Sequence, residues 1–129
     1  MLKTIILVAL GGGVGSVARY LTTLLAASML GPRLPWGTLA VNIVGGFIMG
    51  LITGAFEGRT HDPDLRLFLT TGILGGFTTF SAFSLDAVRL VQNESFAIAG
   101  GYVIASVALA IAGVIFGLAA ARFLFMSAS

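Results

Sequence analysis

The sequence predicts an all-α integral membrane protein built from four transmembrane helices. Of its 129 residues, 57% are hydrophobic and only 9% are charged, whereas soluble domains carry about 25% charged residues. Long apolar runs alternate with short polar segments, as expected for membrane spans joined by loops. The net charge of +2 is too small to indicate a nucleic-acid partner. The lack of cysteine excludes disulfides and thiolate chemistry.

Four apolar stretches have roughly the ~20 residues needed to cross the hydrocarbon core of a bilayer. They cover about residues 4–30, 36–56, 67–91 and 96–121. The first ends before Gly31-Pro32, a turn signal. The second follows Pro35, a residue suited to the first turn of a helix. We therefore expect residues 1–129 to form a single transmembrane domain.

Basic residues give only a weak orientation signal. An even number of crossings puts both termini on one side, which divides these residues four against two. The two groups are Lys3, Arg59, Arg66 and Arg122, against Arg33 and Arg89. A chain that inserts in both orientations would have so small a bias, but many small proteins with one orientation have it too. Both topologies remain open on this observation.

Glycines recur at intervals of four residues, so that they share helix faces. The sets are Gly11 and Gly15; Gly46, Gly50 and Gly54; Gly72 and Gly76; and Gly113 and Gly117. In lipid, such faces allow helix backbones to approach closely and associate through van der Waals contact. The pattern predicts four densely packed helices, with contacts within and between subunits.

Two polar residues lie inside apolar spans. Arg19 falls within the first span, where an arginine costs about 2.5–3.5 kcal/mol on insertion scales, so it should face protein, water or an anion, or else snorkel towards the headgroups. Asn42 precedes Gly46 by one turn on the packing face of the second span. Its amide is expected to face either another helix or a pore.

The third span combines adjacent glycines with threonines and serines, a poor composition for a continuous helix. We expect a break near residues 75–79. Freed carbonyls at such a break need partners, and they form a hard-ligand cage suited to a small cation. Beyond the break, Phe80 and Phe83 share a helix face with Ser84 nearby, although phenylalanines at this spacing are also typical of lipid or core contacts.

Residues needed for other chemistry are missing from the spans. No carboxylate lies within them except Asp86 at the edge of the third, so no proton or cation relay is indicated. No Ser/His/Asp set exists, and His61 lies in a polar loop where a metal site is not expected. We therefore do not expect an enzyme.

Three segments occur in a characteristic order. They are residues 12–20 (GGVGSVARY), 37–45 (GTLAVNIVG) and 75–84 (GGFTTFSAFS). In these segments, and along its whole length, the chain resembles the small bacterial fluoride channels of the Fluc type, also called CrcB proteins. The resemblance implies a fluoride-selective channel that exports fluoride passively and relieves its toxicity. It also implies a multi-pass protein of the bacterial cytoplasmic (inner) membrane that forms an antiparallel, dual-topology homodimer with two pores at the interface.

The resemblance also implies roles for particular residues. Backbone carbonyls of Gly75 and Thr78 from both subunits would bind a structural sodium ion, and Arg19 would hold positive potential near the vestibule. The fluoride path would be formed by Asn42, Phe80, Phe83, Ser84, Tyr102 and Ser106. A dry pore must replace the water of fluoride with donors, and aromatic edges carry partial positive charge, so these residue types fit an anion path. Further along the fourth span, Ala110 and Gly113 offer no hydroxyl, unlike the family pattern.

Two other readings compete with a channel. A proton-coupled small multidrug exporter also has four short spans and antiparallel dimers, but its chemistry requires a carboxylate in the first span, and none is present. A membrane scaffold without transport activity would account for the glycine faces. It would not account for Arg19, Asn42 and the third span together.

Overall fold

The computed structural model describes residues 1–57 and 62–126, so Arg59 and His61 lie outside the described part. The helices are α1 (Leu2–Leu30), α2 (Trp36–Phe56), α3 (Pro63–Leu67), η1 (Phe68–Leu74), α4 (Gly75–Phe77), α5 (Phe80–Asn93) and α6 (Phe96–Met126). Four helical segments are long and apolar enough to cross a membrane. They are Leu2–Leu30, Trp36–Phe56, Pro63–Asn93 and Phe96–Phe125. The predicted all-α class with four candidate spans is confirmed.

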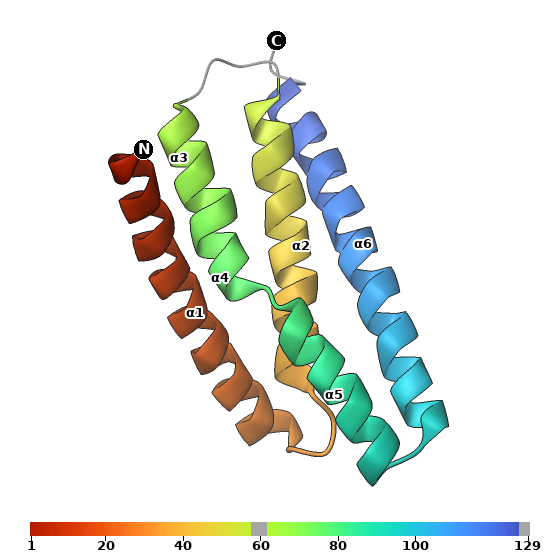
Figure 1. The fold of residues 1–129 in the computed structure, drawn as a ribbon. Helices are drawn as coiled ribbons and strands as arrows, with labels where there is room; N and C mark the ends of the chain where they lie inside the picture. The colour runs from red at the N-terminus through yellow and green to blue at the C-terminus, as the bar shows by residue number, and fades with distance from the viewer. Residues whose placement is uncertain (58–61, 127–129) are drawn as a thin grey trace.

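The helices run up and down in one bundle, and α1 begins at the same end at which α6 finishes (Figure 1). Charged residues gather at the two ends. At the end with the start of α1, Lys3 pairs with Asp64, and Arg122 lies 3.8 Å from Glu57. Arg66 in the short helix α3 also lies at this end, so of the described basic residues outside the middle of a span, three are at this end and two, Arg33 and Arg89, at the other.

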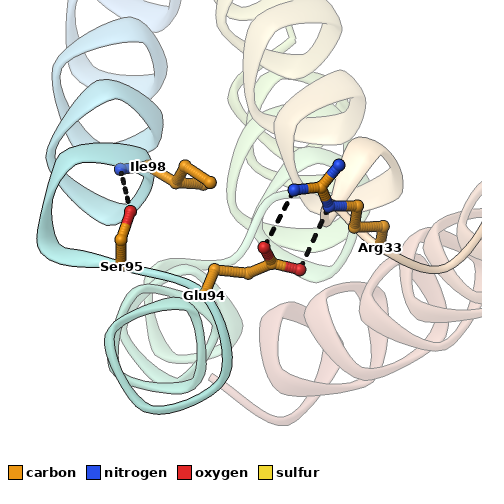
Figure 2. A network of polar contacts seen from close by, with 4 residues as sticks. All are labelled: Arg33, Glu94, Ser95 and Ile98. Atoms are coloured by element: carbon orange, nitrogen blue, oxygen red, sulfur yellow. Dashed lines mark hydrogen bonds and ion pairs between the residues drawn. The ribbon is translucent and has the colours of Figure 1, made fainter.

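The opposite end is tied together by an ion pair between the two connections. The Arg33 guanidinium donates to both carboxylate oxygens of Glu94, at 3.1 and 3.0 Å (Figure 2). Beside it, the Ser95 hydroxyl accepts the backbone N–H of Ile98 at 3.2 Å and caps the start of α6 (Figure 2). The α1–α2 and α5–α6 connections are thus held against each other.

The third apolar segment begins earlier than residue 67, the predicted start. Pro63 is the first residue of α3, and the Asp62 side chain accepts the backbone N–H of Asp64 at 2.9 Å. Proline is favoured at a first helical position and aspartate as an N-cap, which explains the earlier start. The π-helix η1 that follows α3 was not predicted from the sequence.

Between α4 and α5 the chain changes neighbours. Thr78 (φ −80°, ψ 158°) and Thr79 (φ −155°, ψ 121°) are both extended. Before them, η1 and α4 pack on α1; after them, α5 packs on α6. Figure 1 shows this crossing from one side of the bundle to the other. The extended pair lies about half-way along the segment Pro63–Asn93 and therefore at membrane depth.

The glycine faces lie at close helix contacts, as predicted. A Cβ added to Gly11 would lie 2.9 Å from the Cα of Gly72, and one added to Gly46 would lie 2.8 Å from the carbonyl oxygen of Ala110. A Cβ on Gly113 would in turn lie 2.9 Å from the carbonyl oxygen of Ile43. Glycine therefore permits backbone contact of α1 with η1 and α4, and of α2 with α6.

Candidate functional site

The extended residue Thr79 is held by the side chain of Asn42 on α2. The Asn42 Nδ2 donates to the carbonyl oxygen of Thr79 at 2.9 Å, and its Oδ1 accepts the Thr79 backbone N–H at 2.8 Å. Thr79 is only 8% exposed, so its peptide groups need these partners. The amide therefore replaces, for Thr79, the hydrogen bonds that a continuous helix would supply.

This arrangement removes the helical donors of two carbonyl groups. In a continuous α-helix the Thr79 N–H would bond to the Gly75 carbonyl and the Ala82 N–H to the Thr78 carbonyl. Here the Thr79 N–H bonds to Asn42, and the Ala82 N–H bonds to the Thr79 hydroxyl at 3.1 Å. The Gly75 and Thr78 carbonyl oxygens are consequently available to other partners.

Arg19 lies against this junction. Its Nη1 donates to the Thr78 carbonyl oxygen at 3.3 Å. The Thr78 hydroxyl donates to the Leu74 carbonyl at 2.9 Å and so remains attached to α4. An arginine inside the first span therefore has a protein partner, one of the alternatives that the sequence left open.

An aromatic series begins at the first residue of α5. The ring centroids of Phe80 and Phe83 are 5.4 Å apart, and those of Phe83 and Tyr102 are 5.6 Å apart. Phe80 is 78% exposed, whereas Phe83 and Tyr102 are buried. The series thus leads from the outer face of the bundle into the contact between α5 and α6.

A cavity of about 370 Å³ lies beside the junction. Its lining residues are Asn42, Gly45, Gly46, Met49, Thr78, Thr79, Phe80, Phe83, Ser106, Val107, Ala110, Ile111 and Val114. The wall is mainly apolar, and its polar side chains are those of Asn42, Thr78, Thr79 and Ser106. The lining residues Ala110, Ile111 and Val114 have no side-chain hydroxyl.

Two hydroxyls are buried on α6. The Tyr102 hydroxyl and the Ser106 Oγ have no hydrogen-bond partner within residues 1–57 and 62–126. Nearby, Thr38 donates to the Asp86 carboxylate at 2.6 Å. The two unpartnered groups are donors that an entering ligand could engage.

The predicted site residues are partly brought together. Asn42, Thr78, Phe80, Phe83 and Ser106 line one cavity. The remaining four, Arg19, Gly75, Ser84 and Tyr102, are outside its lining. The Tyr102 ring packs on Phe83, which lines the cavity. The Ser84 hydroxyl donates to the Phe80 carbonyl of its own helix at 2.9 Å.

Two residues of this region were not singled out from the sequence. Thr79 fixes the junction, and its signal was available, because a threonine directly before an apolar helical run is a typical N-cap. Thr38 gave no such signal. Its partner Asp86 lies far away in sequence, and only the packing of α5 beside α2 brings the two together.

Comparison with known proteins identifies the family. The model described as "CrcB-like protein, Camphor Resistance (CrcB)" matches residues 6–118. A protein of Agrobacterium fabrum named fluoride-specific ion channel FluC is 51% identical over 122 residues, which are 94% of this chain and 98% of its relative. The protein of that name from Rhizobium etli strain CIAT 652 is 54% identical over 118 residues, 90% and 94% of the two chains. This multi-pass membrane protein therefore belongs to the CrcB family.

Proposed function

We propose that this protein is a fluoride-selective channel that lets fluoride leave the cytoplasm passively, down its electrochemical gradient. Relatives that match over nine-tenths of the chain carry the name fluoride-specific ion channel. The observation that carries the proposal is the convergence of Asn42, Phe80, Phe83 and Ser106 on one cavity. The alternative of a proton-coupled multidrug exporter has no support from these relatives.

The lining of the cavity suits a small, strongly hydrated anion. One of the two N–H hydrogens of Asn42 is taken by Thr79, and the other is left for an ion. The hydroxyl of Ser106 is a second free donor, and the edges of Phe80 and Phe83 carry partial positive charge. In a mainly apolar wall, these groups replace part of the hydration shell of fluoride without offering a cation site.

The working unit in this proposal is an antiparallel homodimer with dual topology. Phe80 is 78% exposed at the mouth of a cavity that opens on the outer face. A large aromatic ring that lines an ion path should not face lipid, so a second copy is the expected cover. The small difference between the basic residues at the two ends fits insertion in both orientations. The expected location is the bacterial cytoplasmic membrane.

A structural sodium ion fits the junction between α4 and α5. The Gly75 and Thr78 carbonyl oxygens have lost their helical donors, although the Thr78 oxygen also accepts a hydrogen bond from Arg19. Carbonyl oxygen is a hard ligand of the kind that unwound helices offer to small cations. Two copies related by a two-fold axis would bring together four such carbonyls. When bound, sodium would be coordinated by these oxygens and would hold the two junctions against each other.

The direct test is fluoride efflux from liposomes that contain the purified protein. We expect rapid efflux of fluoride and none of chloride under the same gradient. Absence of fluoride efflux, or equal efflux of chloride, would contradict the proposed function. The orientation of the subunits in the membrane can be tested separately. A cysteine is introduced at one end of the bundle and treated with a membrane-impermeant thiol reagent, and dual topology predicts that half of the molecules are labelled.

A further inference from the structure

A second cavity, of about 320 Å³, lies at the end of the bundle where α1 is connected to α2. It is lined by the last two turns of α1 and of α5, by the first turn of α2 and by the connection between α1 and α2. We call it the end cavity. Because it lies at the ends of the spans rather than in their middle, and because charged side chains line it, water and dissolved ions should reach it.

The end cavity adjoins the proposed fluoride path. Thr38, which is only 8% exposed, lines its inner wall. Thr38 and Ser106 are both polar neighbours of the Tyr102 hydroxyl, and Ser106 lines the cavity beside Phe80. An ion in the cavity beside Phe80 can therefore reach this end of the bundle through the end cavity.

Four charged side chains line the end cavity, and two of them cancel. The Arg33 guanidinium donates to both carboxylate oxygens of Glu94, at 3.1 and 3.0 Å (Figure 2). Asp86 is half-buried and accepts the Thr38 hydroxyl at 2.6 Å. Arg89 is exposed and has neither an ion pair nor a hydrogen bond within residues 1–57 and 62–126. Its charge is thus the cationic one that no partner in this lining neutralises.

Arg89 is also the outer of the two unpaired charges. It lies about one turn nearer than Asp86 to the end of α5, and it is exposed where Asp86 is half-buried. The first turn of α2, which has no side-chain cap, presents the positive end of its helix dipole to the same cavity. Positive potential in a cavity raises the local concentration of anions and their rate of encounter, and this effect weakens as ionic strength rises.

We infer that Arg89 is a capture residue, whose unpaired positive charge draws fluoride from water into the end cavity. The inference rests on the proposed function and adds to it a residue that sets the rate of entry. Arg19 cannot take this part, because it donates to the Thr78 carbonyl inside the span and does not line the end cavity. A charge in water attracts any anion, so Arg89 should affect the rate of entry and leave selectivity to the groups deeper in the path.

The test is the initial rate of fluoride efflux from liposomes with Arg89→Gln, at low fluoride concentration and at two ionic strengths. Neutral lipid excludes a contribution from charged headgroups, and sodium is held constant while a salt of a large organic anion sets the ionic strength. In about 0.01 M salt we expect the rate to fall about threefold, because a unit charge then acts on the ion almost without screening. In about 1 M salt, where the Debye length is about 3 Å, the difference should shrink below about 1.5-fold.

The double variant Arg33→Gln/Glu94→Gln is the matched control, because it removes one positive and one negative charge from the same cavity. Its rate should stay within about 1.5-fold of the wild-type rate in both salts. Glu94→Gln alone leaves the Arg33 charge without a partner, so it should raise the rate about twofold in low salt. This variant tests the inference even if Arg89→Gln does not fold.

The outcomes separate this inference from the proposed function. A wild-type protein without fluoride efflux would contradict the function, and the inference with it. In a conducting wild type, an unchanged low-salt rate in Arg89→Gln would overturn the role of Arg89 alone. An equal fall in both salts would also overturn it, because a structural effect of the substitution would then explain the loss. So would a fall of the same size in the double variant, or an unchanged low-salt rate in Glu94→Gln.

Discussion

Substitution of Asn42 by leucine tests the central geometry, because one side chain holds both peptide groups of Thr79. Leucine has a similar size but neither accepts nor donates a hydrogen bond. Asn42→Leu therefore removes the bonds of 2.9 and 2.8 Å with little change in volume. We expect the extended pair Thr78 and Thr79 to lose its support while the rest of the bundle stays folded.

The magnitude follows from what is left unpaired. A buried polar group without a partner costs about 1–3 kcal/mol, so one N–H and one carbonyl together cost about 2–6 kcal/mol. Thr79 is buried, and water cannot readily replace the lost bonds. The Thr79 N–H can recover a partner by returning to the Gly75 carbonyl in a continuous helix. At about 1.4 kcal/mol per factor of ten, even the lower bound reduces the ratio of the extended form to the continuous helix roughly 30-fold.

The assay is fluoride efflux from liposomes at one defined protein density, with the elution volume of the purified protein measured alongside it. Efflux in Asn42→Leu should fall strongly, by up to about thirtyfold for a loss of about 2 kcal/mol, at an unchanged elution volume. Thr22→Val is the control, since the Thr22 hydroxyl donates only to Ala18 of its own helix, at 2.9 Å, and its efflux should stay near the wild-type rate. Efflux in Asn42→Leu above a third of the wild-type rate would refute the reasoning.

Three further predictions follow from other parts of the molecule. Phe80→Ile should abolish fluoride efflux without dissociating the oligomer, because it removes an aromatic edge from the cavity; normal efflux would argue against this path. Replacing sodium by a large organic cation should inactivate the channel in efflux assays, and indifference to the cation would argue against a carbonyl cage. The Arg33 guanidinium hydrogen-bonds Glu94 and lowers the pKa of its carboxyl below 4.5. The stability that this pair adds should thus be complete above that pH and disappear as the pH falls through the lowered pKa, so the difference in thermal stability between wild type and Glu94→Gln should vanish in acid.

The architecture could be predicted because the signals behind it are local. Apolar length identifies four candidate spans, and glycines four residues apart identify the faces that pack. These properties depend on composition and on helical period, both of which are readable from a single chain. The earlier start at Pro63 was also readable in principle, from Asp62 as an N-cap and proline at the first helical position.

The site could be predicted only in part, because its contacts join residues that are distant in sequence. The composition of residues 75–84 predicts where a helix should weaken, but it does not identify the partner of Thr79. Asn42 is 37 positions away from Thr79, and Thr38 is 48 positions away from Asp86. Both pairings depend on how α2 packs against the third segment, which single-residue patterns do not reveal.

In the proposed function, Asn42 would couple the two ions. Asn42 Oδ1 takes the N–H that would otherwise occupy the Gly75 carbonyl, and the same amide leaves one N–H for the cavity. One side chain would thus help to free a carbonyl ligand for the proposed sodium ion and supply a donor for the proposed fluoride path. A site in which each ion had its own residues could lose one ion and keep the other. Here a change at Asn42 should impair both, so any residual efflux in an Asn42 variant should require a higher sodium concentration than efflux in the wild type.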